Sequence, residues 1–382
     1  MMNSKKIFGL LFFFLGSAAT GFAQGMPKAV ITVNNPLALE RNAELVAVDW
    51  KQLTAKYPGI DTLNFKILDA SGKQEIAWQL EHHGDKGIRN LLIQVSLKPN
   101  STIKLNVVPG KPAAIAPKTF GRYVPERKDD FAWENDKIAF RMYGKALEGS
   151  KDNAFGTDVW AKRTSKLVLN EWYKTDNYHK DNGDGLDYYH VGFTLGAGDI
   201  APFVKDSVVY PLNYRTWRVL DQGPLRFTFE LTYASWNVAG KPVKVVKTIS
   251  LDAGSQMNRV EAAYTLAAGE SKLPVVMGII RRNEPGEILL NEQKGILGYW
   301  EPVHGEDGII GTGTVALAPI TKMSANNVHL FTQATALANE PFIYYNGAAW
   351  NKAGQITSAQ AWFSYLLNFK QKLEQPLKVS VQ

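Results

Sequence analysis

The 382-residue chain contains no cysteine. This absence excludes disulfide bonds, thiol nucleophiles, cysteine-ligated zinc and iron–sulfur clusters. A lipid anchor attached through cysteine is excluded for the same reason. The chain has six histidines, so a metal site would have to combine histidine with carboxylate ligands.

A strong excess of one charge sign is also missing. The formal net charge is +7, and the basic residues are not gathered in any block, so we expect no nucleic-acid partner. The composition, with 45% apolar and 21% charged residues, is typical of a globular protein. A chain of this length can bury a sizeable core.

No apolar run is long enough to span a bilayer, so we expect no membrane span. The one marked run, 7–15, follows Lys5 and Lys6 and precedes Gly21 and Ala23, small residues at positions −3 and −1 of a cleavage site before Gln24. That arrangement is typical of a cleaved secretory signal peptide, which we assign to 1–23. The sequence therefore predicts a secreted or periplasmic protein.

The dominant local pattern is that of β-strands. Apolar and polar residues alternate strictly over 226–233 and again over 260–266, and 243–251 is rich in β-branched residues. Short turns connect the three segments, which predicts an antiparallel meander without a βαβ order. The expected fold class is mainly β, with a large antiparallel β-sandwich.

The chain is predicted to contain two units. A small N-terminal β-sandwich is expected over 26–117, because short strands are predicted at 29–33, 91–97 and 102–108. A linker rich in proline and alanine follows at 109–114, and the large sandwich is expected over 118–382.

One helix is predicted near the C-terminus. Thr357 and Gln360 form a capping-box pair, and Pro376 ends the helix. The apolar residues between them follow helical spacing and predict a stripe that packs on a sheet: Trp362, Tyr365, Leu366, Phe369 and Leu373.

A glycine pattern at 196–201 resembles a dinucleotide-binding fingerprint. Pro202 follows directly, and neither a helix nor a βαβ unit surrounds the pattern. We therefore interpret the glycines as a tight loop and predict no cofactor.

Aromatic and charged residues are interleaved over 131–218, in segments with poor periodicity. Such loops on a β scaffold are common places for binding sites. If 188–190 is extended, Tyr188 and His190 share one face, where a phenol and an imidazole can act as acid and base. His304 and His329 stay undecided between site and scaffold.

Several of these segments resemble an exported bacterial family catalogued as a domain of unknown function. The likeness covers nearly the whole mature chain and rests on 127–136, 178–192, 217–226, 251–256 and 350–352. The resemblance implies a β-sandwich related to those of polysaccharide lyases and mutarotase-like proteins. Members occur in polysaccharide-utilisation gene clusters, and one member type is an oligosaccharide dehydratase that acts on ulvan fragments.

The resemblance implies removal of water from a terminal uronic acid, which leaves a 4,5-unsaturated sugar. This chemistry needs a carboxylate clamp, a base for the C5 proton and an acid for the leaving 4-hydroxyl. The expected catalytic residues are His190 or His179 as base and Tyr188 or Tyr189 as acid, and the reverse assignment stays open. The expected substrate-binding residues are Arg141, Trp133, Glu134, Trp160, Lys162, Arg163, Lys180 and Arg218.

Three other functions remain open at this point. A glycoside hydrolase needs two carboxylates, which could come from Glu134, Asp136, Asp181 or Asp187. A polysaccharide lyase would share the elimination chemistry but shorten the polymer. A non-catalytic carbohydrate-binding protein would bind sugars without turnover. In each case the expected partner is an acidic oligosaccharide, and no metal ligand is assigned.

Overall fold

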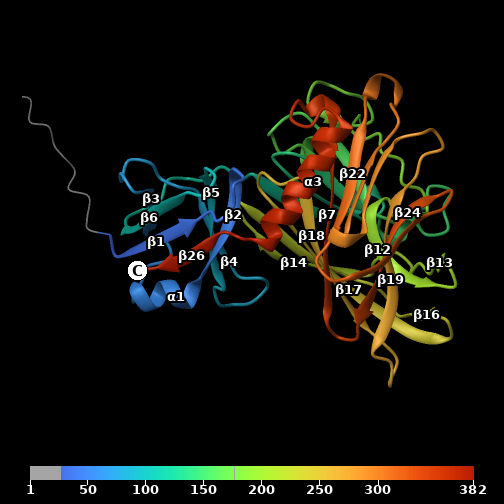
Figure 1. The fold of residues 1–382 in the computed structure, drawn as a ribbon, viewed down its shortest axis with the longest axis horizontal. Helices are drawn as coiled ribbons and strands as arrows, with labels where there is room; N and C mark the ends of the chain where they lie inside the picture. The colour runs from blue at the N-terminus through green and yellow to red at the C-terminus, as the bar shows by residue number, and fades with distance from the viewer. Residues whose placement is uncertain (1–26, 176) are drawn as a thin grey trace, which may run out of the picture.

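The chain folds into two β-sandwich units that lie side by side (Figure 1). The computed structural model describes residues 27–175 and 177–382. The predicted signal peptide, 1–23, lies outside the described residues. Among the helices of the described part, none is both long enough and apolar enough to cross a membrane.

The smaller unit packs two antiparallel sheets around one core. Its core side chains alternate with outward ones, so that Ile31 and Val33 are fully buried. One sheet has the order β26 (Lys378–Val381), β1 (Ala29–Asn34), β6 (Thr102–Pro109) and β3 (Phe65–Asp69). The other has the order β2 (Arg41–Asp49), β5 (Asn90–Leu97) and β4 (Trp78–Glu81), and α1 (Trp50–Lys56) follows β2.

The last strand of the chain belongs to the smaller unit. β26 pairs with β1, with Val381 opposite Ile31. The C-terminus therefore returns to the unit in which the described chain begins (Figure 1). The division of the chain at residue 117 remains a prediction. Because β26 returns to the smaller unit, the chain passes between the two units twice.

The larger unit is built on one wide antiparallel sheet. The predicted meander is confirmed, because 226–233, 243–251 and 260–266 coincide with three neighbouring strands. The order is β14 (Thr216–Gln222), β15 (Arg226–Thr232), β17 (Lys241–Asp252), β18 (Met257–Thr265), β25 (Pro341–Trp350), β22 (Ile310–Ala316), β21 (Ile296–Trp300) and β20 (Glu287–Asn291), with β16 (Trp236–Val238) paired to β17.

Two smaller antiparallel sheets complete the larger unit. One has the order β13 (Ser207–Val208), β12 (Ala197–Val204), β19 (Lys272–Ile280), β24 (His329–Leu337) and β23 (Ile320–Ala325). The other has the order β11 (Gly185–Leu186), β10 (Asp158–Lys162), β9 (Ala139–Met142), β8 (Asp130–Asn135) and β7 (Thr119–Val124). Side chains from all three sheets form one apolar core, in which Phe131, Val275 and Phe229 are buried. The mainly β fold class is confirmed.

The glycine pattern at 196–201 does not form the expected loop. Most of it lies in β12, which pairs with β19 through a β-bulge between Ala197 and Asp199. Gly196 takes a φ of +58°, and a Cβ there would overlap the carbonyl oxygen of Thr157. The glycine therefore permits a close backbone approach at the start of a strand.

Helix α3 (Ala359–Glu374) packs on the outer face of β21 and β22, as its apolar stripe predicts. The predicted N-cap is wrong by one residue. Ser358, and not Thr357, accepts the backbone N–H of Ala361. A shorter helix, α2 (Leu169–Thr175), packs against β8.

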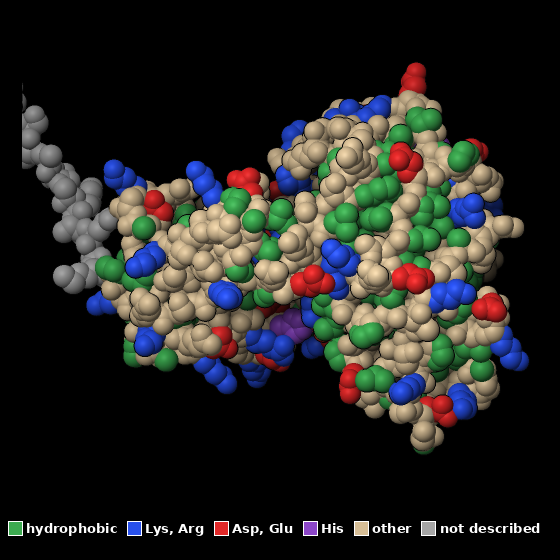
Figure 2. Space-filling view, viewed as in Figure 1, with side chains coloured by type: hydrophobic (Ala, Val, Ile, Leu, Met, Phe, Trp, Pro, Cys, Tyr) green, Lys and Arg blue, Asp and Glu red, His purple; other side chains and the backbone are tan. Residues whose placement is uncertain are grey.

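A narrow waist separates the two units (Figure 2) and is crossed by specific polar contacts. Gln79 of the smaller unit accepts the backbone N–H groups of Leu225 and Arg226 at 2.9 and 2.8 Å. The guanidinium of Arg226 bonds to Glu81 at 2.7 Å and also to Asp252. These bonds fix the orientation of one sandwich on the other.

We predict that Trp362→Ala lowers the free energy of unfolding by about 3–5 kcal/mol, measured by denaturant titration. Trp362 is fully buried, and its indole N–H donates to the carbonyl of Thr312 at 2.9 Å. Gln360→Ala, at an exposed position of the same helix, is the control and should change stability little. Equal effects of the two substitutions would contradict the packing described here.

Candidate active site

The predicted catalytic segment, 187–190, follows β11 and belongs to no helix or strand. Gly185 has a φ of +129°, and a Cβ there would overlap the carbonyl of Ala161, so the close pairing of β11 with β10 requires glycine. The N–H of Asp187 donates to the carbonyl of Tyr178 at 2.7 Å. Asp187 and Tyr189 are buried, whereas Tyr188 is half-buried and His190 is exposed, in agreement with side-chain alternation.

Arg141 anchors the start of this segment. One guanidinium nitrogen, Nη2, lies 3.1 Å from Asp187 and 2.6 Å from Asp158, and Nη1 lies 3.6 Å from Asp130. Arg141 and Asp158 are directly opposite each other on β9 and β10, and Asp130 is on the same face of β8. All four side chains are at most 5% exposed. We call these four residues the arginine cluster.

Burial controls the protonation of the arginine cluster. It raises the pKa of Asp130 to about 7, although Arg141 and Arg127 act in the opposite direction. The pKa values of Asp158 and Asp187 are raised for the same reason. A single buried arginine cannot compensate three carboxylates, so the cluster retains protons near neutral pH.

A second arginine anchors the end of the segment. Arg282, which follows β19, donates to the backbone carbonyl of His190 at 2.7 Å and to Glu301 at 2.9 Å. Its guanidinium carbon lies 4.7 Å from the centroid of the Tyr189 ring. Burial raises the pKa of Glu301 to about 7, although Arg282 lowers it in part.

Tyr188 lies between aromatic and acidic neighbours. Its ring centroid is 5.2 Å from that of His304, whose Nδ1 lies 3.1 Å from Asp307. The hydroxyl is buried and has no hydrogen-bond partner of normal geometry within residues 27–175 and 177–382. Burial, with the charges of Glu301 and Asp307, raises the pKa of Tyr188, so the phenol stays protonated at neutral pH.

Arg163 joins this group from the end of β10. Its guanidinium carbon lies 4.7 Å from the centroid of the Trp350 ring, and the side chain pairs with Asp181. The indole of Trp350 donates to the backbone carbonyl of Asp307 at 2.7 Å. The half-exposed guanidinium of Arg163 is therefore oriented at the same edge as Tyr188.

The group of Tyr188, His190, Arg282, Glu301 and His304 combines complementary chemical functions. A protonated phenol can donate a proton, and an exposed imidazole can accept one. Glu301 exchanges a proton near pH 7, and Arg282 and the neighbouring Arg163 supply positive charge. Together with Arg163, Trp350 and Asp307, we call this group the candidate active site.

Four of the expected substrate-binding residues are interior side chains. Lys162 lies 2.5 Å from Glu134, which also accepts the backbone N–H groups of Val168 and Leu169. Trp160 is fully buried beneath Tyr178, and the Trp133 indole donates to Asn258 at 2.7 Å. The placement of Trp133, Glu134, Trp160 and Lys162 corrects the expectation of direct substrate contact, because each is at most 1% exposed.

The other predicted residues are distributed differently. Arg141 is also buried and acts on the site through Asp187. His179 is exposed, with Nδ1 2.9 Å from the carbonyl of Asp187, and Lys180 is its exposed neighbour. Arg218 pairs with Glu230 on the edge strand β14 and is not part of the group.

The sequence alone did not identify Arg282 and Glu301. Arg282 follows a long apolar strand and its neighbour Arg281 gives the same local pattern, so nothing in the sequence distinguishes the two. Glu301 lies beside Trp300 and close to His304, an aromatic–acid–histidine combination that could have been noticed. His304, left undecided above, lies at the site, whereas His329 is buried and accepts the backbone N–H of Leu195.

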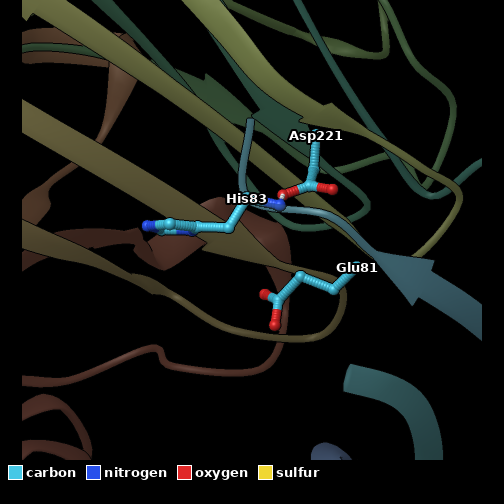
Figure 3. Close-up of side chains that lie close together, drawn as sticks. All are labelled: Glu81, His83 and Asp221. Atoms are coloured by element: carbon cyan, nitrogen blue, oxygen red, sulfur yellow. Dashed lines mark hydrogen bonds between the residues drawn. The ribbon is translucent and has the colours of Figure 1, made fainter. Parts of the chain in front are cut away.

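Glu81, His83 and Asp221 are close enough to hold a metal ion, at the waist between the two units (Figure 3). Both oxygens of Asp221 already accept backbone N–H groups, from His82 and His83, at 2.7 Å each. Glu81 is bonded to Asn90 and to the cation Arg226. Because these carboxylates are compensated and a guanidinium is adjacent, the group does not favour a metal ion.

A cavity of about 710 Å³ lies between the two units, beside α3. Several of its charges pair with one another, such as Lys372 with Glu44 at 3.8 Å and Arg226 with Asp252 at 2.5 Å. Tyr345 lines it from the face of β25 opposite to that of Trp350. The cavity is therefore on the other side of the wide sheet from the candidate active site.

We predict that the free energy of unfolding falls as pH rises from about 4 to 7, and that Asp130→Asn weakens this dependence. The folded pKa of Asp130 is about 7, against 3.8 in the unfolded reference, so the folded state binds more protons in this window. Asp130→Asn should therefore reduce the slope of the unfolding free energy against pH by up to about 1.4 kcal/mol per pH unit.

Denaturant titrations across this pH range measure the slope. Asp85→Asn, at an exposed carboxylate paired with Arg89, is the control. An Asp130→Asn slope equal to that of the wild type would show that Asp130 is ionised in the fold.

Comparisons with known proteins agree with this architecture. Two solved structures share the fold: an α-mannosidase from Enterococcus faecalis (8% identity, TM-score 0.50) and a protein of glycosyl hydrolase family 38 from the same organism (10% identity, TM-score 0.50). Each match covers 93% of this chain, and the chain spans about half the length of those proteins, 46% and 47%.

A curated relative matches over the whole length. "Uncharacterized protein P7" of Formosa agariphila is 31% identical over 395 residues, which cover 96% of this chain and 98% of the relative. A family model described as "Domain of unknown function (DUF4861)" matches residues 33–379. The resemblance predicted from the sequence is confirmed at the level of the family, and the chain belongs to the DUF4861 family.

Proposed function

We propose that this protein is a carbohydrate-active enzyme that removes water from the terminal uronic acid of an acidic oligosaccharide. The observation that carries the proposal is a buried, protonated Tyr188 phenol two residues before the exposed His190 imidazole, in a segment whose side chains alternate in burial. The fold shared with glycoside-hydrolase proteins supports a carbohydrate substrate. The predicted signal peptide supports a secreted or periplasmic location.

The reaction needs positive charge beside the substrate carboxylate. Proton loss from C5 places negative charge on the C6 carboxylate, which a guanidinium stabilises through two parallel hydrogen bonds. Arg163 and Arg282 are the cations at the candidate active site. Arg163 was among the substrate-binding residues expected from the sequence, and Arg282 was not.

Two proton transfers complete the elimination. His190 accepts the proton from C5, the C4–O bond breaks, and Tyr188 donates its proton to the departing hydroxyl, which leaves as water. Tyr188 is then reprotonated from the imidazolium through solvent. The raised pKa of Tyr188 disfavours the reverse assignment, because a tyrosinate base would need a lowered pKa.

A glycoside hydrolase is the second candidate. Glu301 and Asp307 both act electrostatically on Tyr188, so two carboxyl groups lie near the same point, and Glu301 has the raised pKa of a general acid. Such an enzyme adds water across a glycosidic bond. The mass of the product therefore distinguishes the two reactions.

We predict that His190→Ala and Tyr188→Phe each lower the rate of dehydration by about 10²–10⁴-fold, because each removes one proton transfer. Mass spectrometry of uronate-terminated oligosaccharides should show the loss of one water with the wild-type protein. His82→Ala and Tyr57→Phe, at side chains outside the candidate active site, are matched controls that should retain activity. Full activity in both site variants would exclude this mechanism, and a gain of one water would favour the hydrolase.

We predict that Arg282→Ala raises the KM for uronate-terminated oligosaccharides by at least about tenfold, because it removes a cation and releases the carbonyl of His190. The adjacent Arg281→Ala is the matched control, since Arg281 bonds to the carbonyl of Asn326 away from the site. The measurement is steady-state kinetics of both variants. An unchanged KM and kcat for Arg282→Ala would remove this arginine from the site.

A further inference from the structure

A hollow of about 300 Å³ lies at a different edge of the larger unit. It is formed where β7 and β14, the outer strands of two different sheets, approach each other. Its lining shares no residue with the candidate active site and consists of Tyr123, Asp129, Lys145, Tyr214, Arg215 and Trp217.

Two aromatic rings form one wall of the hollow. Trp217 is 43% exposed, although it is among the largest apolar side chains of the protein. Its ring centroid lies 5.2 Å from that of Tyr123, with 25° between the planes. The stacking fixes the orientation of an indole that remains half in water, which is the arrangement that offers a flat apolar surface to a ligand.

Asp129 is held at the hollow by several contacts. It follows Lys128, and both residues adopt left-handed backbone conformations, with φ of +61° and +52°. The hydroxyl of Tyr123 donates to its carboxylate, and the hydroxyl of Tyr214 donates to its carbonyl. A Cβ at Gly144 would overlap that carbonyl, so the approach requires glycine. These contacts thus hold Lys128 and Asp129 in their strained backbone conformations.

Charge at the hollow is available to a ligand. Lys145 is exposed, and none of the ion pairs among the described residues involves it. Arg215 is compensated by Glu148 at 2.8 Å. Lys145 therefore supplies a cation that is in no ion pair, and the Asp129 carboxylate, oriented by Tyr123, supplies a fixed acceptor for a hydroxyl hydrogen.

We propose that this hollow is a second, surface binding site for an acidic saccharide chain. One sugar ring stacks on Trp217, a sugar hydroxyl donates to Asp129, and Lys145 pairs with a carboxylate or sulfate group of the same chain. The choice of an acidic saccharide rests on the proposed function. Binding here holds the substrate chain at the enzyme without placing it at the candidate active site.

Calorimetric titration of the full-length protein with a galacturonic acid hexamer tests the proposal, with cellohexaose as the neutral comparison. We expect two bound hexamers per wild-type chain. Trp217→Ala should weaken one of the two sites at least tenfold, which corresponds to about 1.4 kcal/mol. Lys145→Glu, at an exposed side chain that the fold does not need, should weaken the same site for the galacturonic acid hexamer only.

Leu290→Ala is the matched control, because Leu290 is 48% exposed on β20, at the opposite edge of the wide sheet from Trp217. Unchanged binding in Trp217→Ala and Lys145→Glu would overturn the proposal, and so would equal affinity for cellohexaose. A single bound hexamer that Trp217→Ala abolishes would support the surface site and contradict uronate binding at the candidate active site. If Trp217→Ala does not fold, the affinity of Lys145→Glu for the galacturonic acid hexamer decides between these outcomes.

Discussion

Two guanidinium groups hold the opposite ends of the segment 187–190, and the candidate active site depends on this constraint. Arg141 binds the carboxylate of Asp187, and Arg282 binds the carbonyl of His190. Arg141 comes from β9 and Arg282 follows β19, so the segment bridges two different sheets. The positions of Tyr188 and His190 are therefore set by the packing of the sandwich rather than by a loop alone.

Burial gives this constraint a cost and a consequence. The arginine cluster places three carboxylates around one guanidinium, and desolvation of such groups is costly even when they are paired. The carboxyl groups offset the cost by retaining protons, as the raised pKa of Asp130 shows. On the other side of the segment, burial likewise raises the pKa of the Tyr188 phenol. One physical effect thus shifts the pKa values of groups in the support of the site and of the phenol within it.

The β architecture could be predicted from the sequence because alternation is a local signal. The strands at 226–233, 243–251 and 260–266 and the stripe of α3 followed directly from residue spacing. The site was predictable only in part. Tyr188 and His190 are close together in the chain. Arg282 and Glu301 are brought to this segment by the pairing of distant strands, which a local sequence pattern does not predict.

The burial of Trp133, Glu134 and Lys162 could not be predicted from the sequence, for a related reason. Charged and aromatic residues in a poorly periodic segment suggest a surface, yet β8 is buried on both faces because α2 and the chain that follows β10 cover it. Glu134, which is paired with Lys162, fixes that cover because its carboxylate accepts the N–H groups of Val168 and Leu169. Sequence patterns report the chemistry of a side chain more readily than the layer in which it lies.

The most direct test of the account is a kinetic isotope effect at C5 of the uronic acid. An oligosaccharide carrying deuterium at C5 of its terminal uronate should react more slowly than the unlabelled one, and its product should have lost one water. That result is expected if His190 removes the C5 proton. Turnover at the same rate for both substrates, with a product that has gained one water, would contradict elimination and assign the site to hydrolysis.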